Sequence, residues 1–324
     1  MSGAPPVALP LDALNAWAGE WLGARGFTVR EADPVRAVPW AGVVCFELES
    51  ERGPAVAWGK AMSPPTAVEI DLLAVLARIV PGAVLEPLTS DRERGFLLLP
   101  DGGPTVADLL PDDALPAWRA ALAGYAQLQY DVAPYAEELL DAGAADLRPT
   151  VAADLVAEFA ARDDLLLVGA PHGLTADEVR RLREVAVPGA QTAATLLLDA
   201  EVPATVQHDD MSPSNALVAG RWLDWGDASV AHPFGSLLTA LDGTSGRPGG
   251  RHHVGALRQT YLTVWAEVTG VSADTLEREA DLAVLLAPVG RILAWLRAGP
   301  AALELYPGSI TRWLRRLAAS DWPL

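Results

Sequence analysis

The hydrophobic pattern of the chain changes at a single point, the segment DGGP at residues 101–104. Before this segment, short apolar runs predict strands, and two of them, Gly42–Glu49 and Ala55–Met62, are separated by a turn-forming stretch. After it, alanine and leucine recur at helical spacing through most of the remaining chain. This change predicts an α+β protein of two lobes, a small β-rich domain at residues 1–102 and a larger helical domain at residues 103–324.

Helices are predicted in both lobes. In the small lobe, Leu11–Gly23 carries apolar residues on one face, and a second helix, Ala67–Ile79, follows a pair of prolines. In the large lobe, Trp118–Tyr130 has the same periodicity, and Thr175 followed by Glu178 predicts a capping box that starts another helix. A chain of 324 residues that is 51% hydrophobic can build one large core or two smaller ones.

The charge and cysteine content narrow the classes of partner. A net charge of −18 argues against nucleic acid, because binding phosphate groups needs a basic surface. The same charge favours cationic partners through long-range attraction, although an acidic surface also serves solubility alone. With Cys45 as its single cysteine, the chain can form neither an intrachain disulfide nor a thiolate metal cluster.

Neither a signal peptide nor a membrane span is expected. The N-terminus lacks a basic start followed by an apolar stretch. The best candidate for a membrane span, which starts at Leu282, is broken by Pro288 and Arg291. We therefore expect a soluble cytoplasmic protein with no membrane partner.

Polar residues concentrate at Gln207–Asp227, which reads QHDDMSPSNALVAGRWLDWGD. The stretch from His208 to Asn215 fits H-x-D-x-x-x-x-N, the spacing of a phosphotransfer loop whose Asp accepts a hydroxyl proton and whose Asn holds magnesium. The sequence DWG at residues 224–226 fits D-x-G, whose Asp binds the metal ion on the nucleotide phosphates. The alternative is an ordinary acidic turn.

The residues between the two motifs predict how they meet. The sequence ALVAGRWLDWG at residues 216–226 predicts two short strands joined at Ala219-Gly220. Such a hairpin would bring Asn215 and Asp224 to the same end of a paired ribbon. A few carboxylate or amide oxygens, completed by phosphates and water, are what Mg²⁺ prefers.

A second signal lies in the small lobe, where Lys60 is the chain's only lysine. It falls in the second strand of the predicted hairpin, where the phosphotransfer template has a lysine that reaches the nucleotide phosphates. Arginine cannot imitate this compact charge on a flexible stem. Glu69, nine residues further on, is well placed to pair with Lys60, although it could also be one of several exposed helix acids.

With these elements in order, the chain is similar to the aminoglycoside phosphotransferase and choline kinase-like family. The resemblance runs from about Val29 to at least Trp265 and is strongest at QHDDMSPSNALV and WLDWGDASVAHPFGSL. It implies a protein-kinase-like fold with ATP or GTP bound between the lobes.

The resemblance also implies roles for the residues of the large lobe. Asp210 would be the catalytic base, and Asn215 and Asp224 would bind Mg²⁺. His208 is expected to fix the loop through a hydrogen bond and not to act as a base.

In the small lobe, the resemblance implies a nucleotide site. Lys60, aimed by Glu69, would contact the α- and β-phosphates. The segment Leu98–Asp101 would be the hinge that meets the adenine, so Leu99 and Asp101 are predicted to bind the nucleotide.

The chain departs from the family at three places. Asp209 stands where the family often has glycine, and it adds a carboxylate beside the base. Ser236 replaces a buried aspartate that usually braces the catalytic loop, so the bracing must differ. The expected phosphate-covering loop, Arg36–Gly42, has one glycine only, which disfavours a protein kinase.

The predicted function is transfer of the γ-phosphate of ATP or GTP to a hydroxyl of a small molecule, with an aminoglycoside, amino sugar or other amino alcohol as candidate acceptors. One alternative is a catalytically inactive nucleotide-binding protein. Another is a metal-dependent phosphohydrolase built on the His208 and aspartate cluster. The acceptor pocket is expected from Leu115–Leu198 and Gly243–Trp265. Trp295 is expected in the core, with a ligand platform as the alternative. Asp227 could meet a cationic substrate, but the solvated surface is the favoured expectation.

Overall fold

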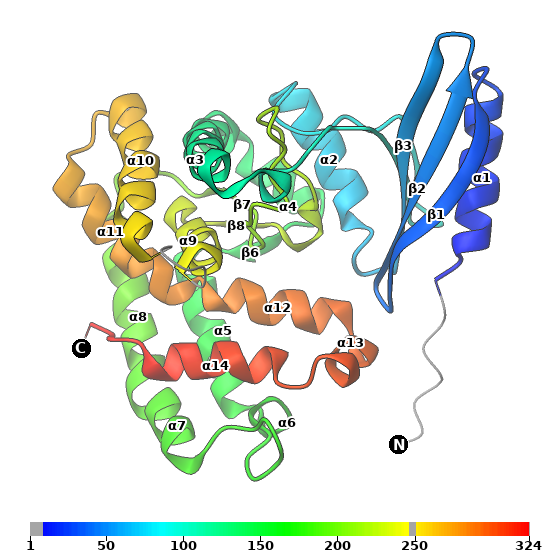
Figure 1. Cartoon of the computed structure of the whole chain (residues 1–324). Helices are drawn as coiled ribbons and strands as arrows, with labels where there is room; N and C mark the ends of the chain where they lie inside the picture. Colours follow the sequence, from blue (N-terminus) through cyan, green and yellow to red (C-terminus); the bar gives the residue numbers. More distant parts are fainter. Residues whose placement is uncertain (1–8, 246–250, 324) are drawn as a thin grey trace.

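The structure is a computed structural model that describes residues 9–245 and 251–323. Within these residues, five strands form one antiparallel sheet in the smaller lobe, in the order β1-β2-β3-β5-β4 (Figure 1). They are β1 (Thr28–Val38), β2 (Ala41–Ser50), β3 (Gly53–Met62), β4 (Thr89–Asp91) and β5 (Phe96–Pro100). The predicted hairpin is therefore confirmed as β2 and β3, and its turn closes at Gly53, whose φ of 104° favours glycine.

Two helices flank this sheet. Helix α1 (Leu11–Gly23) covers the outer face, and α2 (Val68–Ile79) lies between the sheet and the larger lobe (Figure 1). Both helices were predicted, and α1 has the predicted bounds. The apolar face of α1, with Leu14, Ala18 and Leu22, packs against sheet residues such as Phe46, and together they form the smaller of two cores.

Strand β1 was not predicted, and it shortens the expected phosphate-covering loop. β1 runs to Val38 and β2 begins at Ala41, so only Pro39 and Trp40 form the turn. The strand escaped prediction because it is an edge strand with a mostly exposed surface and no apolar alternation. Its Pro34 is tolerated at this edge, next to an irregularity in the pairing with β2.

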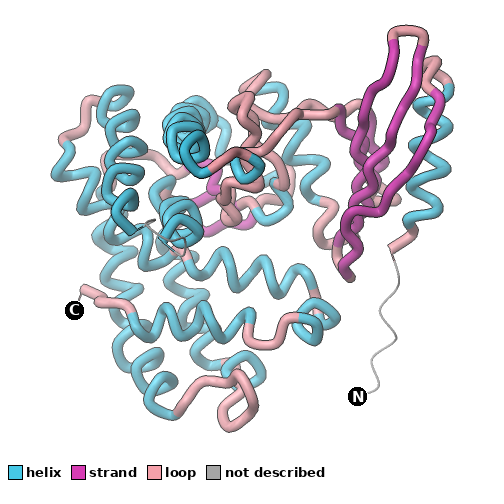
Figure 2. Tube along the Cα trace, in the orientation of Figure 1, coloured by secondary structure: helices cyan, strands magenta, loops and turns pink. Residues whose placement is uncertain are grey.

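The larger lobe is mostly helical (Figure 2). Its helices are α3 (Pro111–Val132), α4 (Ala136–Asp141), α5 (Pro149–Ala161), α6 (Asp163–Leu166), α7 (Ala176–Arg181), α8 (Val187–Leu196), α9 (Leu237–Ser245), α10 (Arg251–Thr269), α11 (Ala273–Leu286), α12 (Pro288–Ala298), α13 (Pro300–Leu305) and α14 (Ser309–Ala319). The predicted capping box at α7 is present: Thr175 Oγ1 accepts from Glu178 N, and Glu178 Oε2 accepts from Thr175 N. Residues 246–250, inside the range expected to help form the acceptor pocket, lie outside the described residues.

A small sheet in the larger lobe holds the two motif segments together. It consists, within the described residues, of β6 (Ala145–Leu147), β8 (Ser229–Ala231) and β7 (Thr205–Gln207), in that order. β7 ends directly before His208, and β8 begins two residues after Asp227. Because β7 and β8 pair antiparallel, the segments that carry the two motifs emerge from the same end of this sheet.

The larger core crosses from one lobe to the other. It includes Leu72, Leu73 and Leu76 of α2 together with Trp118 and Leu122 of α3. The division into domains at residues 1–102 and 103–324 remains a proposal: it falls in the connection between β5 and α3, but α2 packs with both sides.

The apolar run that starts at Leu282 is divided between two helices. α11 ends at Leu286 and α12 begins at Pro288. Across the part of the chain that the structure describes, no helix combines the length and apolarity needed to cross a bilayer.

Truncating the α1 face should destabilise the smaller lobe. Leu14 is fully buried between α1 and the sheet, so Leu14→Ala should lower the free energy of unfolding by about 2–5 kcal/mol through lost burial and a cavity. Urea denaturation followed by circular dichroism measures this change. Leu198→Ala is the matched control, because Leu198 is 66% exposed and its truncation should shift stability by less than about 0.5 kcal/mol. Equal effects of the two substitutions would contradict the packing of α1.

Candidate active site

A cavity of about 650 Å³ lies between the two lobes. The small lobe lines it with β-strand residues that include Val43, Lys60 and Leu99. The large lobe contributes residues of the segment 210–227 and one side of α12. Residues from both predicted motifs and from the hinge therefore face one space.

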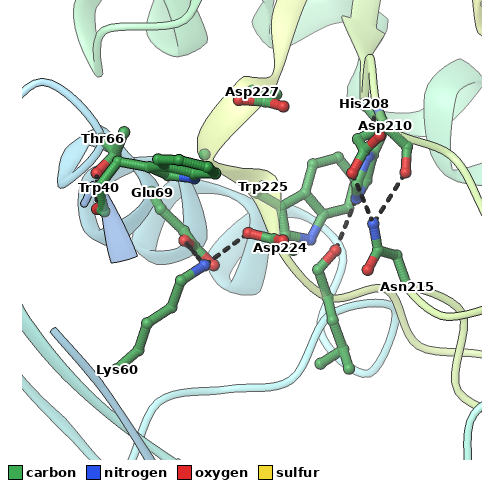
Figure 3. A network of polar contacts seen from close by, with 12 residues as sticks. Trp40, Lys60, Thr66, Glu69, His208, Asp210, Asn215, Asp224, Trp225 and Asp227 are labelled. Atoms are coloured by element: carbon green, nitrogen blue, oxygen red, sulfur yellow. Dashed lines mark hydrogen bonds and ion pairs between the residues drawn. The ribbon is translucent and has the colours of Figure 1, made fainter. Parts of the chain in front are cut away.

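Lys60 joins the two lobes through its ammonium group. Its Nζ lies 2.5 Å from Glu69 Oε2 and 2.6 Å from Asp224 Oδ1 (Figure 3). Glu69 comes from the first turn of α2 and is 2% exposed, so it is not an exposed helix acid. The predicted pairing of Lys60 with Glu69 is present.

These contacts shift the pKa values of Lys60 and Asp224 toward their charged forms. Burial on its own would lower the pKa of Lys60, but the carboxylates of Asp224 and Glu69 outweigh it and the pKa lies above its ordinary value. The charge of Lys60 is in turn the main reason that the pKa of Asp224 falls to about 2. At neutral pH, an ammonium ion therefore faces an ionised Asp224 across the cleft between the lobes.

The segment between the two motifs folds back on itself as predicted, although it forms one bridge and not two strands. Ala216 pairs with Trp222, and Leu223 N donates to Asn215 O at 2.9 Å. Asn215 and Asp224 consequently lie at the same end of the turn. Asp224 has a left-handed φ of 62°, a strained conformation that is concentrated at functional sites.

Asp210 and Asn215 lie against each other at the cavity. Asn215 Nδ2 donates to Asp210 O at 2.9 Å and approaches Asp210 Oδ2 at 3.4 Å (Figure 3). The amide oxygen of Asn215 and the carboxylate of Asp224 form a donor set that suits Mg²⁺. Among residues 9–245 and 251–323, His, Cys, Asp and Glu side chains do not gather in threes as a protein metal cage would require. This donor set fits a magnesium ion whose remaining ligands come from phosphates and water.

His208 has the hydrogen-bonding role that was predicted. It is fully buried, its Nε2 lies 2.7 Å from Leu223 O, and its Nδ1 accepts from Asp210 N at 3.4 Å. Burial lowers its pKa, so the ring is neutral and Nε2 donates to the carbonyl. The ring thereby ties the loop that carries Asp210 to the residue before Asp224.

The loop that carries Asp210 is braced from α3, in a structure where Ser236 stands in place of the usual aspartate. Tyr125 OH accepts from His208 N at 2.9 Å, and Gln129 Nε2 donates to Val206 O at 2.6 Å. Ser236 Oγ accepts from the same amide at 3.2 Å. Tyr125 and Gln129 were not predicted, because a spacing of four on a buried helix face is also what ordinary core packing gives.

Asp209 points into the protein and does not line the cavity. Its side chain accepts hydrogen bonds from Gln207 Nε2 and from Ser229 Oγ. Burial raises its pKa to about 7, although both hydrogen bonds act in the opposite direction. The expectation that Asp209 adds a carboxylate beside the base is corrected: this group belongs to the interior and is readily protonated.

Arg291 connects Asp210 to Asp227, and the sequence did not predict this contact. Arg291 Nη2 lies 3.2 Å from Asp210 Oδ1, and Arg291 Nη1 lies 3.0 Å from Asp227 Oδ2. Asp227 is therefore part of the cavity wall and not of the solvated surface. No motif could identify Arg291, because it lies 81 positions after Asp210 (291 minus 210) in a helix with ordinary apolar periodicity.

An aromatic cluster lines the cavity where the β1–β2 turn meets α12. Trp40 of the β1–β2 turn packs against Trp295 of α12 and Tyr306 after α13, with ring centroids 6.0 and 5.9 Å apart. Trp295 packs against the larger core as expected, but its ring also lines the cavity. The predicted acceptor ranges, 115–198 and 243–265, contribute no described residue to the lining, and residues of α12 together with Tyr306 line it instead.

The predicted hinge residues Leu99 and Asp101 also line the cavity. Leu99 pairs with Trp58 across β5 and β3, and both line the cavity. Asp101 Oδ1 accepts from Trp58 Nε1 at 3.3 Å and from Gly103 N at 3.2 Å. Contact of Leu99 and Asp101 with a nucleotide base stays a prediction.

Comparisons with known proteins show the fold. No family model and no curated protein matches the sequence. The choline kinase LicA from Streptococcus pneumoniae has a TM-score of 0.57 at 13% identity, covering 96% of this chain and 99% of its own. An ethanolamine kinase from Plasmodium vivax has a TM-score of 0.57 at 13% identity, covering 90% of this chain and 82% of its own. A mutant of aminoglycoside phosphotransferase APH(4)-Ia with ADP and hygromycin B has a TM-score of 0.55 at 11% identity, covering 95% and 99%. The predicted two-lobed, protein-kinase-like fold is confirmed.

Enlarging Gly290 should disturb the loop that carries Asp209 and Asp210. A Cβ added at this third residue of α12 would overlap the Asp209 carboxyl group. Helix propensity alone favours Gly→Ala by about 1 kcal/mol, but overpacking costs about 1–3 kcal/mol, so Gly290→Ala should be destabilising. Thermal unfolding measures the sign. Gly124→Ala in α3 is the matched control, because open space surrounds Gly124 and this change should stabilise the protein. A gain of stability in both variants would contradict the contact.

The buried Asp209 should make stability depend on pH. In the folded state Asp209 keeps its proton up to about pH 7, whereas in the unfolded chain it loses the proton near the ordinary pKa of 3.8. Ionisation of Asp209 therefore lowers the free energy of unfolding as the pH rises between these two values. Asp209→Asn, which resembles the protonated acid, should remove a decline of about 1.4 kcal/mol per pH unit in this window. Urea unfolding of both proteins from pH 5 to pH 8 measures the difference. Parallel stability curves would show that Asp209 is ionised throughout.

Proposed function

We propose that the protein transfers the γ-phosphate of ATP or GTP to a hydroxyl group of a small molecule. The observation that carries the proposal is the meeting of Lys60, Asp224, Asn215 and Asp210 at one cavity. Their order along the chain and their residue types are those of the phosphotransfer template. The fold agrees with this reaction, but the residues of the site carry the proposal, because one fold serves many functions.

The proposed reaction uses each of these residues for positioning or for charge stabilisation. Lys60, held by Glu69, neutralises the nucleotide phosphates. Asp210 orients the acceptor hydroxyl and accepts its proton, while the γ-phosphoryl group moves from the β,γ-bridging oxygen to the hydroxyl oxygen and leaves ADP or GDP. Asn215 and Asp224 would hold a magnesium ion, which would supply positive charge to the nucleotide phosphates.

The cavity wall formed by the aromatic cluster and Asp227 favours an acceptor molecule with a positive charge. The rings of Trp40, Trp295 and Tyr306 attract cations through their faces, and Asp227 adds a carboxylate. We therefore propose aminoglycosides, amino sugars and other amino alcohols as the acceptor class. A reaction that consumes ATP or GTP is consistent with a location in the cytoplasm.

A screen of hydroxylated metabolites and antibiotics tests the reaction. Wild-type protein with Mg²⁺ and ATP or GTP should form the nucleoside diphosphate only when an acceptor is present. Asp210→Asn should lose most of this activity, on the order of 10²-fold or more, because it removes the proton acceptor. It should still bind nucleotide, which titration calorimetry measures. Turnover retained by Asp210→Asn would refute the assignment.

Lys60→Ala separates this function from its alternatives. The proposed kinase should lose nucleotide affinity with this change, because the phosphates lose their main protein cation. A phosphohydrolase built on the His208 and aspartate cluster would release phosphate without an acceptor and would not need Lys60. An inactive nucleotide-binding protein would lose affinity in Lys60→Ala but would transfer phosphate to no compound in the screen.

A further inference from the structure

Helix α12 borders the cavity with one of its faces. Arg291, Ala294, Trp295 and Ala298 all line the cavity, and their spacing of three, four and seven residues places them on that face. The face begins beside Asp210 and ends at the β1–β2 turn. α12 therefore forms the wall at which an acceptor would meet the proposed base.

The guanidinium group of Arg291 holds the catalytic loop at its side chain and at its backbone. Nη2 lies 3.2 Å from Asp210 Oδ1, and Nη1 donates to the carbonyl oxygen of Asp209 at 2.9 Å. Nη1 also donates to Asp227 Oδ2 at 3.0 Å. The Arg291 side chain is 11% exposed, so water and salt screen these contacts less than they screen surface ion pairs.

Arg291 also balances the charges at this end of the cavity. The carboxylates of Asp210 and Asp227 are brought close to one cation, and without it their like charges would repel. Burial raises the pKa of Asp227, and the charge of Arg291 opposes that shift. Lys60 neutralises Asp224 in the same way from the other lobe. Each cation thus stabilises a different part of the acidic site.

The geometry of these contacts suits arginine and not lysine. A guanidinium group is a planar fork that can satisfy several oxygens in fixed directions, whereas an ammonium group is a point charge on a flexible stem. Nearly all basic residues of this chain are arginines, so the residue type alone carries little information. The three oxygen partners of Arg291, all on segments that carry the motifs, are what distinguish it.

We infer that Arg291 is a positioning residue of the proposed reaction, which fixes the Asp210 carboxylate and its loop in the orientation that meets the acceptor hydroxyl. Its effect on catalysis rests on the proposed function and runs through Asp210. Its effect on the loop does not depend on that function, because it follows from the contacts with Asp209 and Asp210 alone.

A purely structural role is the competing explanation. Gly290 packs against Asp209, and Arg297 donates to the Gly226 carbonyl at 2.5 Å, so α12 is attached to the site at other points too. If Arg291 only attached the helix, its removal would lower stability without a separate effect on turnover. If it positions Asp210, turnover falls in a protein that stays folded and still binds nucleotide.

Steady-state kinetics distinguishes the two roles. Arg291→Met should lower kcat by about 10²-fold, because a misplacement of about 1 Å in a catalytic group has this effect. Its KM for ATP should stay close to the wild-type value. Its melting temperature should fall but stay above the assay temperature, so that the loss of kcat occurs in folded protein. Arg291→Lys keeps the charge but loses the fork, so it should recover part of kcat. Arg258→Met is the matched control, because Arg258 bridges Glu277 and Asp281 away from the cavity.

Hydrogen exchange tests the positioning without any acceptor. Peptides that cover residues 207–217 should exchange faster in Arg291→Met than in wild-type protein, and at the wild-type rate in Arg258→Met. If no acceptor supports turnover, the proposed function fails, but this measurement still decides the role of Arg291. Unchanged exchange in residues 207–217 of Arg291→Met would overturn the inference. So would a loss of kcat that is equal in the two variants or that unfolding accounts for.

Discussion

The arrangement of the site depends on one ammonium group. Lys60 lies on a strand of the small lobe, and its two carboxylate partners lie on α2 and on the DWG turn, the latter 164 residues away in sequence. Taking charges out of water is costly, and the attraction between them offsets this cost only while all three groups keep their geometry. The positions of α2 and of Asp224 relative to the sheet therefore depend on the same contact. The space left between Lys60 and the loop of Asp210 follows from it.

Most of the fold and the main site residues could be predicted, because each left a local signal. α1, β2, β3 and α2 have clear periodicities, and the spacing of the two motifs is enough to single out Asp210, Asn215 and Asp224. A single lysine in a chain rich in arginine marks Lys60. Strand β1 left no such signal, because an edge strand that buries little surface needs no apolar alternation.

The residues that support the loop of Asp210 from other helices could not be predicted, because only tertiary packing brings them to that loop. Tyr125 and Arg291 lie on helices α3 and α12, whose sequences predict only that an apolar face packs into the core. Each becomes informative only when the fold brings it to the loop of Asp210, across 83 residues for the Tyr125–His208 contact and 82 for Arg291–Asp209. The contribution of α12 to the cavity was missed for the same reason, because the predicted acceptor ranges, 115–198 and 243–265, stop before this helix.

Asp209 and Asp210 show how adjacent carboxyl groups can be given different tasks. Asp209 adopts a left-handed φ of 63°, which costs a residue other than glycine on the order of 1–3 kcal/mol. This conformation turns its side chain inward to Gln207 and Ser229, while Asp210 stays at the cavity. The resembling family often has glycine at the first of these positions and braces the loop with an aspartate where this chain has Ser236. In this chain the buried carboxyl group of Asp209, which belongs to the loop itself, helps to brace the loop. The strain at Asp209 is then explained, because glycine would relieve it only by removing that brace.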